Sequence, residues 1–234
     1  MLKKLALVTL GAALIAGGVW WTSAKPGQTT LASSAQTLIA TPAMADTTAP
    51  APDAAPLPDV PDMSLGNPDA KVTVTEYLSF TCPHCEEFHA TVWKDIKKNY
   101  VDTNKIKFTV REVYFDKYGL WAGMMAHCGG PLRYFGIVDI LYDTQQKWAG
   151  SQDPNTVVAS LRQIGKTAGM TDAQLDQCMN DGKMAQALVE KYQKDSAADH
   201  IEGTPSFVID GTTYKNMGYD EFSKILDAEL AKNG

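Results

Sequence analysis

The sequence predicts an α/β fold in which a helical subdomain interrupts a strand-containing core. Within residues 72–115, apolar and polar residues first alternate, apolar residues then recur with helical spacing, and the alternation then returns. This is the pattern of a strand–helix–strand unit. Residues of about 118–198 carry helical periodicity throughout, and residues 206–230 return to two strands and a helix. That helical stretch is far longer than a crossover between parallel strands requires, so we interpret it as an insertion.

The strand–helix–strand unit begins with residues 72–80, a run that alternates and is rich in β-branched and aromatic residues. After it, Phe88, Val92 and Ile96 recur every fourth residue, which places them on one face of a helix. Residues 106–115 alternate again. We therefore expect two parallel strands joined by a right-handed crossover.

Local signals mark the boundaries of the later elements. Asp153-Pro154 combines a capping residue with a proline at the first helical position. Residues 171–174 have the spacing of a capping box. Asp210-Gly211 separates two short strands and is typical of a tight hairpin turn, and an amphipathic helix follows Asp220.

Two cysteines lie in the loop between the first strand and its helix, in the order Cys82, Pro83, His84, Cys85. The first turn of a helix offers unpaired N–H groups and the positive end of the helix dipole. We therefore expect the pKa of Cys82 to lie below the free value of about 8.5. Pro83 suits an early helical position, and a protonated His84 would favour the thiolate further. The spacing predicts a dithiol centre with Cys82 as nucleophile and Cys85 as resolving thiol.

Two other uses of this pair are half of a zinc site and an inert structural disulfide. The remaining cysteines, Cys128 and Cys178, lie far along the chain and neither belongs to a second C-x-x-C motif, so we predict no metal site. Both fall within the helical insertion. Two buried thiols would fit there, but we expect a structural disulfide, because the chain looks exported.

Residues 76–85 resemble the active-site segment of the DsbA family, the thioredoxin-fold disulfide oxidoreductases of the bacterial periplasm. The Pro-His dipeptide between the cysteines is that family's usual one, and residues 66–70 and 203–211 resemble its other landmarks. The likeness covers about residues 64–233. It implies a thioredoxin fold, βαβ followed by ββα, with a helical insertion at about residues 118–198.

The resemblance implies roles for three further residues. The Thr204-Pro205 bond is expected to be cis, with the backbone of Thr204 against the sulfur of Cys82, where a substrate chain can pair with it. Glu76 matches an acid that handles the proton of the second cysteine in thioredoxin-like enzymes, although a solvated glutamate at a sheet edge also fits the pattern. We expect surface or packing roles for the isolated histidines, His89, His127 and His200.

These expectations describe an oxidoreductase that introduces disulfide bonds into exported proteins and needs no cofactor of its own. The resemblance also implies a membrane partner of the DsbB kind that reoxidises the protein with quinone. A disulfide isomerase or reductase would use the same residues, and a non-catalytic binding module or holdase would retain the fold alone. A Pro/Ala-rich segment stands where DsbC-like isomerases carry an N-terminal dimerisation domain, which disfavours the isomerase.

The N-terminal region indicates export. Lys3-Lys4 precedes an apolar run at residues 5–21, so we interpret residues 1–24 as a signal peptide or a membrane anchor. Residues 25–63 are rich in Pro, Ala and Thr and are predicted to be a disordered linker before a domain at 64–233. We expect a periplasmic protein, either soluble after cleavage or anchored to the inner membrane. The net charge of −6 gives no support for a nucleic-acid surface.

Overall fold

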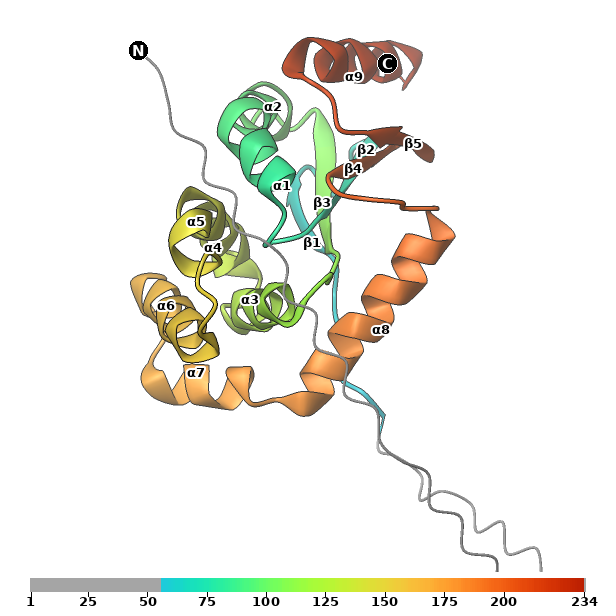
Figure 1. Ribbon diagram of the computed structural model, residues 1–234. Coiled ribbons are helices and arrows are strands. Elements are labelled where there is room, and N and C mark those ends of the chain that lie inside the picture. Colours follow the sequence, from blue (N-terminus) through green and yellow to red (C-terminus); the bar gives the residue numbers. More distant parts are fainter. Residues whose placement is uncertain (1–55, 234) are drawn as a thin grey trace, which may run out of the picture. The chain divides into compact units, whose positions relative to one another are not determined.

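The computed structural model describes residues 56–233 (Figure 1). The predicted signal or anchor, and all but the end of the predicted linker, lie outside the described residues. The strands are β1 (Met63–Gly66), β2 (Val72–Leu78), β3 (Ile106–Glu112), β4 (Ser206–Ile209) and β5 (Thr212–Lys215). Within residues 56–233, no helix combines the length and the hydropathy that a membrane span needs.

The helices fall into three groups. The active-site helix is one continuous helical stretch made of α1 (Pro83–Phe88), a π-helical segment (His89–Trp93), α2 (Lys94–Ile96) and a second π-helical segment (Lys97–Val101). The insertion contains α3 (Lys117–Cys128), α4 (Pro131–Asp143), α5 (Gln145–Trp148), α6 (Pro154–Thr167), α7 (Asp172–Met179) and α8 (Gly182–Ala198). The last helix is α9 (Tyr219–Asn233).

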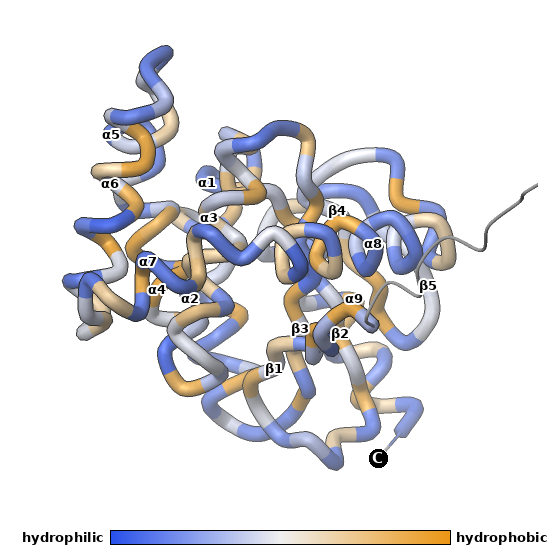
Figure 2. Tube along the Cα trace, turned by 90° about the horizontal axis from the view of Figure 1, so that it is seen from below, coloured by the Kyte–Doolittle hydropathy of each residue, from blue (hydrophilic) through white to orange (hydrophobic). Residues whose placement is uncertain are grey.

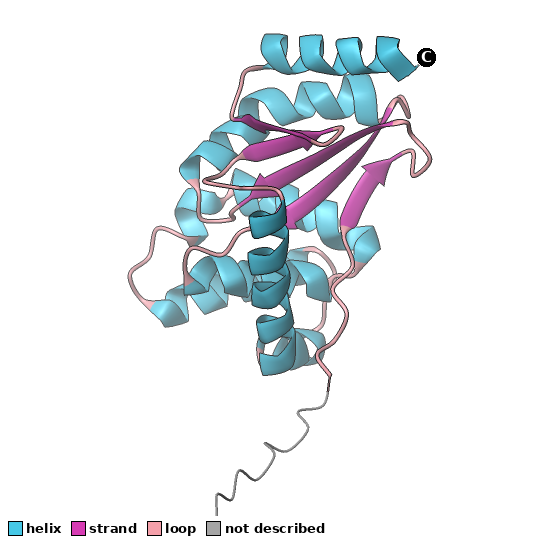
Figure 3. Cartoon of the chain, turned by 90° about the vertical axis from the view of Figure 1, so that its right-hand side faces the viewer, coloured by secondary structure: helices cyan, strands magenta, loops and turns pink. Residues whose placement is uncertain are grey.

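The five strands form one sheet in the order β1-β3-β2-β4-β5 (Figure 3). The strands β2 and β3 are parallel, and the other neighbours are antiparallel. The hairpin between β4 and β5 turns at Asp210 and Gly211, whose φ angles of 44° and 82° are those that a tight type I′ turn requires. The βαβ unit followed by ββα confirms the predicted thioredoxin fold.

Helices cover both faces of the sheet, which explains why β2 is buried on both sides. Val74 and Glu76 lie on the face of the active-site helix, while Tyr77, on the other face, donates its hydroxyl to Asp199 at the end of α8. A strand covered on both faces can hold apolar residues at successive positions, as the buried Tyr77 and Leu78 do. The core continues from the sheet into α3, α4, α6 and α7.

The insertion spans Lys117 to Ala198, close to its predicted limits. Asp153 caps α6, and the capping box at Thr171 and Gln174 is formed. Figure 2 shows hydrophobic residues alternating with hydrophilic ones along its helices, as an amphipathic pattern requires. Cys128 and Cys178 form the predicted disulfide, which joins the end of α3 to α7.

The fold begins earlier than the predicted boundary at residue 64, so the interpretation of residues 57–63 as linker is wrong. Val60 is buried against Met124 and Leu188, with Leu57 beside them. Asp62 forms ion pairs with Arg111 and Lys191, at 3.0 and 2.6 Å. The composition of this segment is that of a linker, but its few apolar residues meet a surface made by α3 and α8, which only the folded chain brings together.

Candidate active site

The two cysteines of the C-x-x-C motif occupy the start of α1, as their position in the sequence predicts. Cys82 is the residue before the helix, with φ −82° and ψ 120°, and Pro83 occupies the first helical position. The carbonyl of Cys82 accepts hydrogen bonds from the N–H groups of Cys85 and Glu86, both at 3.2 Å. Cys82 is partly exposed and Cys85 is fully buried, and the two thiols are not bridged. An incoming thiol can therefore reach only the first cysteine.

The surroundings push the pKa values of the two thiols apart. A hydrogen bond from the Cys85 thiol, supported by the backbone N–H groups of Cys85 and His84, lowers the pKa of Cys82 to about 5 from an ordinary 9.0, against the effect of partial burial. Burial raises the pKa of Cys85 far above its ordinary value, and the Cys82 sulfur and the Glu76 charge add to that rise. At neutral pH the centre is one thiolate and one thiol.

His84 contributes through its backbone more than through its ring. The imidazole is exposed and lies 3.8 Å from the carboxylate of Glu87, which is exposed as well. An exposed pair of this kind contributes little. The predicted electrostatic help from the ring is therefore weak, whereas the backbone N–H of His84 contributes to the low pKa of Cys82.

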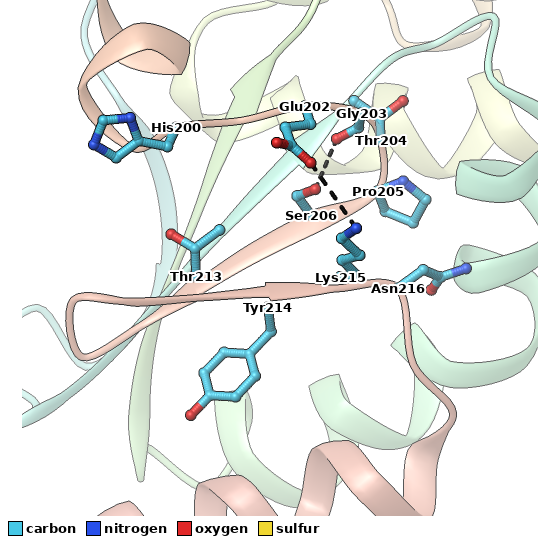
Figure 4. Close-up of a pocket in the computed structure, with 10 residues that line it drawn as sticks. All are labelled: His200, Glu202, Gly203, Thr204, Pro205, Ser206, Thr213, Tyr214, Lys215 and Asn216. Atoms are coloured by element: carbon cyan, nitrogen blue, oxygen red, sulfur yellow. Dashed lines mark hydrogen bonds and ion pairs between the residues drawn. The ribbon is translucent and has the colours of Figure 1, made fainter.

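The loop before β4 lies against the exposed cysteine. The Thr204-Pro205 bond is cis, and the carbonyl oxygen of Thr204 accepts a hydrogen bond from the protonated Cys82 thiol at 3.4 Å. Figure 4 shows these two residues at one side of a pocket of about 420 Å³, with Thr213 and Lys215 of the edge strand β5 at another. The pocket that extends from Thr204 to the edge strand β5 thus adjoins the reactive sulfur at Thr204.

Glu76 lies beneath the active-site helix and is fully buried, which excludes the alternative of a solvated glutamate at a sheet edge. Its Oε1 lies 3.2 Å from Nε2 of His89. His89 is not isolated, as the sequence suggested it was: its ring is buried among aromatic side chains, in keeping with the expected packing role, and it also pairs with a carboxylate. The sequence offered one signal for His89: it stands four residues after Cys85 and four before Trp93, which is the spacing of one helix face.

Gln145 is a site residue that sequence reasoning missed. It is buried, and its Nε2 donates to the carbonyls of Phe80 and Cys82 at 2.9 and 3.0 Å. It thereby fastens the cysteine loop to the insertion. The available signal was its phase: Gln145 stands four residues after Leu141 and three before Trp148, on the apolar face of its helical segment.

A second buried carboxylate–histidine pair joins β3 to the insertion. Glu112 accepts hydrogen bonds from Nε2 of His127, at 2.8 Å, and from the hydroxyl of Tyr134. Burial alone would raise the pKa of Glu112 and lower that of His127, but their mutual attraction reverses both directions. The expectation that His127 is isolated is therefore wrong. No group of three metal-ligating side chains exists within residues 56–233.

Comparison with known proteins identifies the family. A family model described as thioredoxin matches residues 59–228. A Rickettsia bellii relative named "Putative protein-disulfide oxidoreductase" is 35% identical, over 75% of this chain and 67% of its own length. Disulfide bond formation protein D of Bacillus subtilis is 25% identical, over 71% and 76%. The crystal structure of Wolbachia pipientis alpha-DsbA1 superimposes with a TM-score of 0.69 at 26% identity, covering 75% of this chain and 94% of that one.

The chain belongs to the thioredoxin family, and within it to the DsbA-like thiol–disulfide oxidoreductases. This confirms the family and the fold expected from residues 76–85 and the segments around them. The chain spans only 60 to 62% of the length of four further rickettsial relatives with similar names.

Proposed function

We propose that the protein introduces disulfide bonds into exported proteins by dithiol–disulfide exchange at Cys82 and Cys85. The observation that carries this direction is the low pKa of Cys82, about 5. That pKa exists only in the dithiol form, so ionisation stabilises the reduced protein over the oxidised one at every pH above about 5. A protein whose reduced form is stabilised in this way is a strong oxidant of substrate dithiols.

The exchange proceeds in two displacements. A substrate thiolate attacks Cys82 Sγ, the bond to Cys85 breaks, and Cys85 leaves and takes up a proton. A second substrate thiolate then attacks the substrate sulfur of the mixed disulfide, so that the substrate gains a disulfide and Cys82 departs as the stabilised thiolate. Exposure of Cys82 and burial of Cys85 support this order.

Thr204 and Pro205 are proposed to bind the substrate chain. The carbonyl of Thr204 lies 3.4 Å from the Cys82 sulfur, and the adjoining pocket offers room for a side chain next to the scissile disulfide. An extended peptide could then add to the backbone of this loop as a strand adds to a sheet.

The protein would act in the periplasm, either soluble or tethered through residues 5–21, and a DsbB-like, quinone-linked membrane protein would restore its disulfide. Residues 5–21 lie outside the described residues, so this part of the proposal rests on the signal-like sequence and on the family. The relatives' names, which refer to protein disulfides and disulfide bond formation, support the same activity.

The reduction potential tests the direction. Intact protein is equilibrated with glutathione buffers from pH 4 to 9, and the Cys82–Cys85 state is read by alkylation and mass spectrometry. We expect a value nearer to that of DsbA, about −120 mV, than to that of thioredoxin, about −270 mV. The potential should fall by about 59 mV per pH unit below pH 5 and about 30 mV above it, because only Cys85 then takes a proton. A value at the thioredoxin end would mean a reductant or isomerase.

A further inference from the structure

The residue immediately before the reactive cysteine is hydrogen-bonded to the helical insertion. Thr81 donates its hydroxyl to Oδ2 of Asp116 at 2.6 Å, a length typical of a hydrogen bond to a charged acceptor. Asp116 is the residue before α3, and its Oδ1 accepts from the N–H groups of Tyr118 and Gly119, at 2.7 and 3.0 Å. One carboxylate therefore joins the first turn of α3 to the peptide that leads into Cys82.

The first turn of α3 packs directly against the cysteine loop. Gly119 is buried, and a methyl group at its position would lie 3.4 Å from the hydroxyl of Thr81 and 3.7 Å from that of Ser79. Those two hydroxyls are themselves 3.3 Å apart. The lack of a side chain at Gly119 thus lets α3 approach the loop closely enough for Asp116 to reach Thr81.

The contact at Thr81 differs in kind from the other contacts between the insertion and this loop. Three of those contacts end on carbonyl groups: from Tyr142 to Ser79, and from Gln145 to Phe80 and Cys82. Thr81 is held through its side chain instead. Because Thr81 is fixed to α3 and the carbonyl of Cys82 is fixed to Gln145, the chain is held on both sides of the Cys82 N–Cα bond. The φ angle of Cys82 is restricted as a result.

The chemistry of Cys82 depends on the direction of its sulfur, and that direction follows from φ. With φ at −82° and ψ at 120°, Cys82 lies just before α1. There the Cys85 thiol, together with the N–H groups of Cys85 and His84, lowers the pKa of Cys82 to about 5. Hydrogen bonds weaken steeply when their geometry is lost. A rotation of Cys82 would therefore destabilise its thiolate and make its sulfur a poorer leaving group in exchange.

We propose that Asp116 is a positioning residue for thiol–disulfide exchange, which acts through the Thr81 hydroxyl to hold the Cys82 sulfur against the start of α1. This inference rests on the proposed exchange function. A negative charge near a thiolate opposes its formation, so the proposed benefit of Asp116 is geometric. The sign of the effect distinguishes the two roles: loss of a positioning contact raises the pKa of Cys82, whereas loss of a nearby charge lowers it.

The pKa of Cys82 is the readout of the test. It is measured on the intact reduced protein by thiolate absorbance from pH 3 to 9, and again from the pH profile of alkylation by iodoacetamide. Thr81→Val removes the hydroxyl but keeps the shape of the side chain, and it should raise this pKa by about 0.5 to 1 unit. Thr81→Ser keeps the hydroxyl and should stay within about 0.2 units of wild type. Asp116→Ala should raise the pKa as Thr81→Val does.

The reduction potential and a double variant sharpen the test. A rise of one unit in the pKa of Cys82 destabilises the reduced form tenfold at neutral pH, so the potential of Thr81→Val against glutathione should fall by up to about 30 mV. The double variant T81V/D116A should shift the pKa no further than the larger single shift, because both residues serve one contact. Additive shifts would show that the two residues act separately and would overturn the proposal.

Asp153 provides a matched control in the same insertion. It caps α6 by accepting from the N–H groups of Asn155 and Thr156, both at 3.2 Å, and it accepts from the Thr156 hydroxyl at 2.7 Å. Asp153→Ala and Thr156→Val therefore make the same chemical changes at a cap that bonds to its own helix. Both should leave the pKa of Cys82 within about 0.2 units of wild type. A shift as large as that of Asp116→Ala would indicate a general loosening of the insertion and contradict the positioning role.

Thr81→Val carries the test alone if Asp116→Ala does not fold, because it leaves the cap of α3 intact. A folded Thr81→Val with the wild-type pKa and potential would overturn the proposal, as would a lowered pKa in Asp116→Ala. The exchange function fails separately. Wild-type Cys82 with a pKa near the ordinary 9.0, or without reaction toward oxidised glutathione, would contradict that function. A low wild-type pKa that no variant changes removes the positioning role alone.

Discussion

Cys82 and Cys85, at the start of α1, are free thiols, whereas Cys128 and Cys178, which join α3 to α7, form a disulfide. The first pair stands at a helix N-terminus with one sulfur exposed and a low pKa. The second pair has no such position, and it closes a loop within the insertion. The same amino acid therefore serves reactivity in one region and stability in the other.

The two buried carboxylate–histidine pairs differ in how completely they are hydrogen-bonded. Around Glu112, the ring of His127 and the hydroxyl of Tyr134 both donate to one carboxylate oxygen, and none of the three side chains has a buried atom without a partner. In the other pair, Oε2 of Glu76 and Nδ1 of His89 are buried and have no hydrogen-bond partner in the protein. A buried network whose groups are all hydrogen-bonded holds its side chains in one arrangement, and the pair at Glu76 is less completely held.

The largest expected effect is a loss of activity that follows from changing the first cysteine pair but not the second. Cys82→Ser removes the thiolate that forms the mixed disulfide, so oxidation of a model dithiol peptide should fall to the uncatalysed rate. Replacing Cys128 and Cys178 together with Ala should leave that rate within about twofold of wild type but lower the free energy of unfolding by up to about 4 kcal/mol. Activity that survives in Cys82→Ser would contradict the assignment of the nucleophile.

The next effect distinguishes the two glutamates. Glu112→Gln leaves His127 without its counter-charge, which should cost about 3 kcal/mol in urea unfolding, since breaking a buried pair from one side is expensive. Glu76→Gln should cost less, because the Glu76 side chain makes a single hydrogen bond, to His89.

The cost of Glu112→Gln should depend on pH. The pKa of Glu112 is lowered from 4.5, so its contribution is lost as pH falls through the folded-state value. The pKa of His127 is raised from 6.5, so its contribution is lost as pH rises through the folded-state value. The difference between wild type and variant should therefore be greatest between about pH 4.5 and 6.5. A difference that is constant from pH 4 to 9 would show that the pair is not ionic.

The sequence predicted what depends on local pattern. The strand-helix-strand unit, the caps at Asp153 and Thr171, the Asp210-Gly211 turn and the limits of the insertion all follow from spacing or turn chemistry. The position of Cys82 at a helix N-terminus follows from the same kind of argument. Each of these features is decided by residues close together in the chain.

The sequence could not predict what depends on contacts between distant segments. Glu112 and His127 are 15 residues apart, and Gln145 reaches the carbonyl of Cys82 across 63 residues. Periodicity marks such positions as buried but does not say which polar group will face them. The prediction for residues 57–63 was wrong for the same reason. Their composition is typical of a linker, and it does not reveal the distant surface on which the segment packs.

The smallest effect concerns the hydrogen bonds by which Gln145 joins the helical insertion to the cysteine loop. Gln145→Met removes both donations from the insertion to the cysteine loop while keeping a similar volume. The carbonyl of Cys82 keeps its helical partners, but the carbonyl of Phe80 loses its side-chain donor in a buried place, which should cost about 1–3 kcal/mol in urea unfolding. Gln146→Met, at the exposed neighbouring position, is the control and should change stability by less than about 0.5 kcal/mol.

Gln145→Met should also raise the pKa of Cys82 slightly, by less than about one unit, because the loop that aims the N–H groups at its sulfur is held less firmly. Thiolate absorbance followed from pH 3 to 9 measures this pKa, and the disulfide of the insertion does not interfere, since it does not titrate. If Gln145→Met loses stability while the pKa of Cys82 stays unchanged, the insertion supports the fold of the active-site loop without tuning its chemistry. If the pKa rises, the helical insertion tunes the reactivity of Cys82 through the buried amide of Gln145.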